Sequence, residues 1–143
     1  MHKVFGRKED VAYRDRPGAY IIPIRDGCVA VVRTRRGHFL LGGGLEPGEP
    51  DVTCIERECL EEVGRAVAVG EKIGSAEAYC DFPTMGYLHL YQTYYAGALL
   101  EKIQEPIETG HELVWIPLAQ ARDKMYHPAQ AWAIEECWRR QNI

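Results

Sequence analysis

The segment Gly42 to Gly64 reads GGGLEPGEPDVTCIERECLEEVG and decides the fold, because it joins a run of glycines to one amphipathic helix. Apolar residues recur there at the three- and four-residue steps of a helix face, at Val52, Ile55, Cys59 and Val63. Pro50 suits the first helical position, and Gly64 suits the left-handed residue after the last turn. The segment therefore predicts a glycine loop at 42–44 that ends the preceding strand, followed by a helix over 50–63.

Three glutamates of this helix, Glu58, Glu61 and Glu62, are three and four residues apart, so their carboxylates share one flank. On a solvated face these acids would repel one another, and Glu61 and Glu62 also lie at the negative end of the helix dipole. Arg57 is the nearby cation that offsets this repulsion. The pattern favours a bound divalent cation, and an exposed face with unrelieved repulsion is the alternative.

Carboxylate oxygens without a convergent histidine or thiolate select a hard cation, Mg²⁺ first and Mn²⁺ second. Mg²⁺ keeps several water ligands and is commonly completed by phosphate oxygens, so we expect a substrate with a di- or polyphosphate. The glycines at 42–44 agree with this expectation, because they let the backbone approach an anion closely.

The same segment resembles the Nudix box, in which a glycine, a glutamate, an Arg-Glu pair, a Glu-Glu pair and a final glycine stand at fixed spacing. The matching residues are Gly43, Glu49, Arg57, Glu58, Glu61, Glu62 and Gly64. Two flanking stretches, Arg16–Tyr20 and His111–Trp115, look like the MutT-like branch of that family. Leu41, Cys59 and Arg65 depart from the usual residues at their positions, but none of these departures removes a carboxylate.

The resemblance implies an α/β protein with the Nudix fold, an α/β/α sandwich around a mixed central β-sheet, and we expect one domain over residues 1–143. It also implies Mg²⁺-dependent hydrolysis of a pyrophosphate bond in a nucleoside diphosphate linked to another moiety. That compound would be a nucleotide sugar, ADP-ribose, a dinucleoside polyphosphate or a nucleoside triphosphate. The alternative is a non-catalytic nucleotide-sensing module of the same fold. An isomerase on this fold is a third class, for which the sequence shows no additional machinery.

The resemblance also assigns roles by position. It implies that the metal ligands are Glu58, Glu61, Glu62 and the backbone of Gly43. Arg57 would pair with Glu49 and hold the loop against the helix, which Gly64 ends. Gly42 and Gly44 would lie near the phosphates.

The catalytic set is expected to comprise Arg57, Glu58 and Glu61, with Glu61 as a candidate general base. Glu108 and Glu112 precede the last predicted strand, where members of the family often supply another acid. Glu112 is our candidate for that role, against the reading that it is an ordinary exposed acid.

Substrate contacts are expected from an arginine cluster and an aromatic hairpin. Arg35 lies with Arg33 and Arg36 beside the turn that leads to the glycines, and guanidinium groups suit phosphates, with a solubilising turn as the alternative. Tyr87 belongs to a hairpin where a base could stack on a ring, although core packing is the alternative there. His89 and His111 are expected to serve as surface or packing residues rather than as bases.

The remaining chain predicts strands on both sides of the box and two helices after it. The strand patterns lie at 20–24, 28–32, 38–41, 71–79, 87–99 and 113–116, and the helical patterns at 117–126 and 128–140. Pro23 indicates an edge or a bulge in its strand, and residues 1–18 read as an irregular lead-in or an edge strand. The last helix is expected to bury Trp132, Ile134, Cys137 and Trp138.

The composition limits the kinds of binding partner that we expect for this chain. A formal net charge of −4 over 143 residues offers no general attraction for nucleic acid or anionic lipid. The 5 cysteines lack zinc-site spacing and are expected to be reduced thiols in a cytoplasmic protein. We therefore expect a small-molecule nucleotide as the partner, without nucleic acid or membrane, and a homodimer is compatible with the sequence.

Overall fold

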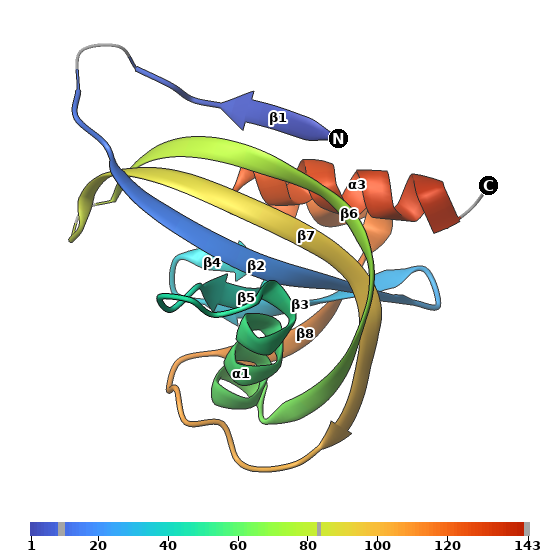
Figure 1. Cartoon of the computed structure of the whole chain (residues 1–143). Coiled ribbons are helices and arrows are strands. Elements are labelled where there is room, and N and C mark those ends of the chain that lie inside the picture. Colours follow the sequence, from blue (N-terminus) through green and yellow to red (C-terminus); the bar gives the residue numbers. More distant parts are fainter. Residues whose placement is uncertain (9–10, 83, 142–143) are drawn as a thin grey trace.

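Two long antiparallel strands, β6 (Arg65–Phe82) and β7 (Gly86–Lys102), form the centre of the computed structural model, which describes residues 1–8, 11–82 and 84–141 (Figure 1). Both strands are longer than the predicted 71–79 and 87–99, and their register shifts three times between Arg65 and Gly74. Such bulges bend a strand without ending it. The expected turn at 82–86 contains Pro83, which lies outside the described residues.

The other strands complete a mixed sheet in the order β1-β6-β7-β2-β3-β4, with β5 on β2 and β8 on β3. These strands are β1 (His2–Phe5), β2 (Arg14–Arg25), β3 (Cys28–Thr34), β4 (Gly37–Phe39), β5 (Leu41–Gly44) and β8 (Glu112–Pro117). The pairs β1·β6 and β2·β7 are parallel, and the others are antiparallel. The expected edge strand within residues 1–18 is thus β1.

Pro23 does not mark an edge or a bulge, because β2 lies between β7 and two other strands. The antiparallel ladder to β5 ends at Ile21, and the ladder to β3 begins at Ile24. Pro23 stands between these ladders, where its missing N–H leaves no gap in either of them. The prediction from Pro23 alone was therefore wrong.

The glycines 42–44 form strand β5 rather than the predicted loop, and they pair with Gly18–Tyr20 of β2. The predicted strand 38–41 divides at Leu40, where the chain leaves β3 and joins β2. A Cβ on Gly42 would lie 2.2 Å from the Ala19 carbonyl oxygen. The glycines thus allow the backbones of β5 and β2 to lie close together within the sheet.

Helix α1 (Asp51–Val63) follows directly, and its ends agree with the prediction to within one residue. Pro50 is the residue before the helix rather than the first helical one, whereas Gly64 is left-handed with φ 69° as expected. Val52 is 43% exposed and does not belong to the buried face. Cys54 takes its place beside Ile55, Cys59 and Val63.

The C-terminal part contains η1 (Leu118–Gln120), α2 (Ala121–Lys124) and α3 (Pro128–Gln141). The predicted helix at 117–126 is thus two short pieces. In α3, Ile134 and Cys137 are buried and Trp132 is partly buried, but Trp138 is 40% exposed, which corrects its assignment to the core.

Helices α1 and α3 cover opposite sides of the sheet (Figure 1). Successive side chains of a strand alternate between faces, so Ile21 packs into the core under α1 and Ile22 into the core under α3. The result is the expected α/β/α sandwich. All 5 cysteines are free thiols. None of the described helices is long and apolar enough to cross a membrane.

Candidate active site

Strand β5 lies directly against the acidic flank of α1. A Cβ on Gly43 would stand 2.5 Å from the Glu58 carboxyl carbon, so this position has no room for a side chain. The Gly42 N–H donates a hydrogen bond to Glu62 Oε1 at 3.1 Å. The glycine strand therefore places backbone groups beside two of the glutamates.

Arg57 connects this strand, the following loop and the helix. Its Nε and Nη2 each lie 2.8 Å from a Glu49 carboxylate oxygen, which is the pair that the resemblance implies. Its Nη1 lies 2.9 Å from Glu58 Oε1 and 3.3 Å from Glu61 Oε2, and Nη2 donates to the Gly44 carbonyl at 3.1 Å. The bonds from Arg57 lower the pKa of Glu49 to about 2. Glu49 and Arg57 thus form a fixed charged support.

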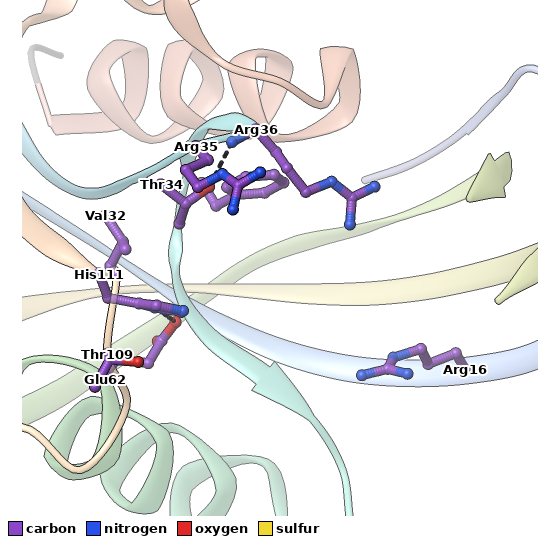
Figure 2. A pocket seen from close by; sticks show the side chains of 10 residues that line it. Arg16, Val32, Thr34, Arg35, Arg36, Glu62, Thr109 and His111 are labelled. Atoms are coloured by element: carbon purple, nitrogen blue, oxygen red, sulfur yellow. Dashed lines mark hydrogen bonds and ion pairs between the residues drawn. The ribbon is translucent and has the colours of Figure 1, made fainter. Parts of the chain in front are cut away.

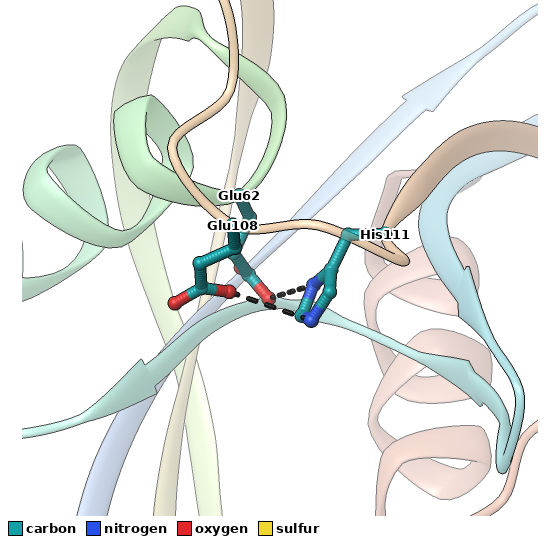
Figure 3. Close-up of side chains that lie close together, drawn as sticks. All are labelled: Glu62, Glu108 and His111. Carbon is teal, nitrogen blue, oxygen red and sulfur yellow. Dashed lines mark ion pairs between the residues drawn. The ribbon is translucent and has the colours of Figure 1, made fainter.

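The structure divides the predicted acid trio into two groups. Ligand atoms of Glu58, Glu61 and Glu108 lie within 4.8 Å of one another, and so do those of Glu62, Glu108 and His111. Figure 3 shows the side chains of Glu62 and Glu108 together on one side of the His111 ring. Glu62 has an oxygen 3.4 Å from the ring Nδ1, and Glu108 has one 3.4 Å from Nε2. Glu108 therefore belongs to both groups.

Glu108 reaches this position because its loop binds the end of α1. The N–H groups of Ile107 and Glu108 donate to the Glu61 carbonyl at 2.9 and 3.0 Å, and Ile103 N–H donates to the Gly64 carbonyl at 2.8 Å. These bonds satisfy carbonyls that a helix end leaves without partners. That general need was visible in the sequence, but it does not say which loop meets it.

Glu112 does not join either group of acids among the described residues. It lies on β8 opposite Arg33 of β3, and the two side chains form an ion pair on the exposed surface. His111, expected at the surface or in packing, lies instead beside two acids. The sequence correctly indicated that the segment before β8 supplies an additional acid. Which side chains of that segment face α1 depends on the residue at which β8 begins.

Electrostatics at the site fit a hard cation. Burial raises the pKa of Glu58 to about 7, with Glu62 adding to the rise and Arg57 opposing it. Burial also raises the pKa of Glu62, which is 7% exposed. Crowded, half-buried carboxylates are unfavourable without a compensating positive charge. Glu58, Glu61 and Glu108 offer only oxygen ligands, which suit Mg²⁺.

A pocket of about 660 Å³ opens beside this cluster (Figure 2). Glu62, Thr109 and His111 line one part of it, and Arg16, Arg35 and Arg36 line another. Of the expected substrate contacts, Arg35 is thus on its wall. Tyr87 does not line the pocket, since its ring packs edge-on against Tyr13 with 5.8 Å between the ring centroids. Arg16 was missed, because nothing in the sequence indicates that β2 passes this pocket.

The comparisons with known proteins agree with this geometry. A family model described as NUDIX domain matches residues 14–137. A NUDIX hydrolase from Nitrosomonas europaea has a similar structure, with TM-score 0.72 and 20% identity over 88% of this chain and 90% of that one. A MutT NUDIX hydrolase from Burkholderia pseudomallei gives TM-score 0.66 and 23% identity over 86% and 98%.

The Escherichia coli ORF135 protein, solved in solution, gives TM-score 0.68 and 22% identity over 90% of this chain and 92% of that one. Comparison with curated proteins found no match. The structural likenesses support the fold, and the family match spans most of the sequence, including the glycine strand, α1 and the loop with Glu108. The chain therefore belongs to the Nudix family.

Proposed function

We propose that this chain binds Mg²⁺ at its acidic cluster and hydrolyses a pyrophosphate bond of a small nucleotide. The coarser activity, pyrophosphate hydrolysis on a nucleoside diphosphate derivative, follows from family membership. The observation that carries the finer proposal is the convergence of Glu58, Glu61 and Glu108 within 4.8 Å beside an open pocket. Mn²⁺, which also prefers oxygen ligands, would be a substitute.

The proposed metal ligands are Glu58, Glu61 and Glu108. Glu62, on the pocket wall, and the backbone of Gly43, against Glu58, adjoin them and stay proposed contacts of the ion. When bound, the ion supplies charge neutralisation at the phosphate oxygens and acidifies water. Arg57 holds Glu58 and Glu61 in place through its Nη1 and is itself held by Glu49. The network thus fixes the acids before a substrate arrives, which is what phosphoryl transfer needs.

Glu61 is the proposed general base. Its side chain is 32% exposed, against 15% for Glu58, so it is the more accessible of the two to a water molecule. The carboxylate would accept the proton of that water as the water attacks phosphorus. Gly42 and Gly44 flank the cluster on β5 and stay proposed phosphate contacts.

Hydrolysis is tested with a panel of nucleotide sugars, ADP-ribose, dinucleoside polyphosphates and nucleoside triphosphates, each with Mg²⁺ and with EDTA. We expect Mg²⁺-dependent cleavage that falls at least 100-fold or so in Glu61→Gln, in line with general-base effects of about 10²–10⁴. Glu71→Gln, on the exposed surface of β6, is the matched control and should keep the rate. Binding of nucleotides without cleavage of any panel member would favour the sensing module instead.

A further inference from the structure

The pocket beside the acidic cluster also has positively charged side chains on its wall. In Figure 2 Arg35 and Arg36 lie together on one turn, Arg16 lies apart from them on another strand, and Glu62 lies with His111 on a third part of the pocket wall. Arg16 comes from β2, whereas Arg35 and Arg36 form the turn between β3 and β4. A pocket with an acidic and a basic end can hold two different groups of one ligand.

These three arginines are not used in ion pairs. Among residues 1–8, 11–82 and 84–141, none of the three lies within 4.0 Å of a carboxylate oxygen, although Arg16 Nη1 donates to Met85 Sδ at 3.4 Å. Five arginines of the same residues pair with an acid, namely Arg33, Arg57, Arg122, Arg139 and Arg140, and others outside the pocket do not. Unpaired like charges on one pocket wall repel each other, and an anion between them removes that repulsion. Charge is therefore available for a ligand.

The turn that carries Arg35 and Arg36 is rigidly built. The Arg36 N–H donates to Thr34 Oγ1 at 3.1 Å, and the Thr34 hydroxyl donates to the Gly37 carbonyl at 3.3 Å. The Arg36 guanidinium carbon lies 4.6 Å from the ring centroid of Phe82 and 5.7 Å from that of Tyr126. Stacking uses the face of a guanidinium and leaves the N–H groups at its edge free to donate.

Arg16 links the basic wall to the proposed metal site. Its Nε lies 3.7 Å from the point where a Cβ on Gly44 would stand. The Gly44 carbonyl in turn accepts a hydrogen bond from Arg57, which holds Glu58 and Glu61. The pocket volume, about 660 Å³, is in the range of small-molecule sites and exceeds what a bare pyrophosphate needs.

We propose that the substrate carries an anionic group in addition to the two phosphates of the cleaved pyrophosphate, and that Arg35 and Arg36 bind this group while Arg16, beside Gly44, contacts the phosphates. The inference rests on the proposed function, because the acidic end must hold the cleaved pyrophosphate. Two sources share the required chemistry. One is the terminal phosphate of a nucleoside triphosphate, and the other is a phosphate ester on the linked moiety.

The experiment compares substrate pairs that differ by one phosphate: ATP with ADP for the first source, and coenzyme A with dephospho-coenzyme A for the second. kcat/KM is measured with Mg²⁺, and dissociation constants are measured by calorimetry in EDTA, where no turnover is needed. The wild type should prefer the phosphorylated member of one pair about tenfold or more in both readouts, as expected for charge-assisted hydrogen bonds. The preferred pair identifies the source.

The variants Arg35→Gln and Arg35→Gln/Arg36→Gln should lose this preference, because they should lower kcat/KM and affinity for the member with the extra phosphate far more than for the member without it. Among the described residues, rings lie under the guanidinium of Arg36 but not under that of Arg35. Arg35→Gln should therefore keep the fold, and it serves as the test if the double variant does not fold. Arg122→Gln removes the same charge from a side chain that is 78% exposed outside the pocket, and it should keep the preference.

The two proposals fail in different ways. Cleavage of pyrophosphates without preference in either pair, or an equal loss for both members in the arginine variants, would overturn the anion site alone. A preference in binding without any cleavage would contradict the proposed hydrolysis and leave the anion site standing.

Discussion

At the scale of single residues, the position of Glu108 is the largest difference between the predicted site and the observed one. The sequence placed an additional acid just before β8 and favoured Glu112, but the structure brings Glu108 to Glu58 and Glu61. Sequence spacing could not make this choice, because it depends on where the strand begins and how its loop binds the carbonyls of α1. The residues of the Nudix box lie close together in the sequence, on β5, α1 and the loop that joins them, so their spacing predicted well which of them are neighbours in the structure.

The first prediction concerns this pair of acids. Glu108→Gln should weaken Mn²⁺ binding and lower the Mg²⁺-dependent rate by about 10- to 100-fold, since it removes one charge from the ligand group. Glu112→Gln should leave both within about twofold, because Glu112 pairs with Arg33 on the surface. Mn²⁺ titration followed by electron paramagnetic resonance measures the affinity. The reverse order of effects would return the role to Glu112.

The second prediction concerns His127, which is 6% exposed and packs edge-on against Phe39 and Phe82. Burial, with a smaller effect of Arg36, lowers the pKa of its ring from 6.5 to about 4. The folded chain thus binds this proton less tightly than the unfolded chain, so stability falls as the pH drops from about 6.5 toward 4. The loss amounts to about 3 kcal/mol at most.

Replacement by phenylalanine removes this proton uptake. Urea unfolding between pH 4 and pH 7 should show a shallower decline of the free energy of unfolding in His127→Phe than in the wild type. Equal slopes in the two proteins would show that His127 does not titrate between the folded and unfolded states.

At the scale of elements, α1 was predictable because its pattern is local: a helix period, a proline before it and a glycine after it. Strand β5 was not, since three glycines have little strand propensity and pair only because β2 lies beside them. The parallel pairing of β2 with β7 joins residues far apart in the chain, so no local pattern indicates it.

The third prediction concerns the end of α1, where Gly64 has φ 69° and a Cβ would lie 1.9 Å from the Gln104 carbonyl oxygen. Gly64→Ala should release the loop that carries Glu108, lowering both stability and Mn²⁺ affinity. Gly48→Ala is the matched control, because Gly48 has φ 74° with nothing within 4 Å of its Cβ position. Gly48→Ala should lower the free energy of unfolding only by the backbone strain of a left-handed alanine, about 1 kcal/mol.

Thermal unfolding together with Mn²⁺ titration separates the two glycines. An equal loss of stability and an unchanged Mn²⁺ affinity in both variants would show that docking of the loop does not place Glu108.

At the scale of the whole molecule, the two cores and the mixed sheet agree with the sequence reading, but the pocket does not follow from it. Its walls come from β2, the β3–β4 turn and the loop before β8, which meet only in the folded chain. The arginine cluster indicated Arg35 correctly. Arg16 and His111 each begin a stretch that resembles the MutT-like branch, but nothing in the sequence assigns either side chain to the pocket. Tyr87 was chosen for its aromatic ring, and strand register directs that ring away from the pocket wall.

The fourth prediction concerns the stability of the whole domain. Because the ion should bind the folded chain alone, saturating Mg²⁺ should raise the free energy of unfolding and therefore Tm. The free energy should rise by about 2.7 kcal/mol at a Mg²⁺ concentration 100 times its Kd. Glu58→Gln/Glu61→Gln should reduce the rise strongly, since it removes two ligands and much of the repulsion. A similar rise in wild type and variant would indicate that Mg²⁺ binds elsewhere.

The most direct test of the metal site is a crystal structure with Mn²⁺ and a slowly cleaved nucleotide, read by anomalous scattering. We expect Mn²⁺ between Glu58, Glu61 and Glu108, at about 2.1–2.2 Å from their oxygens, with phosphate oxygens of the nucleotide completing its coordination. Anomalous density elsewhere, with these three carboxylates turned to solvent and the phosphates bound apart from them, would contradict the account.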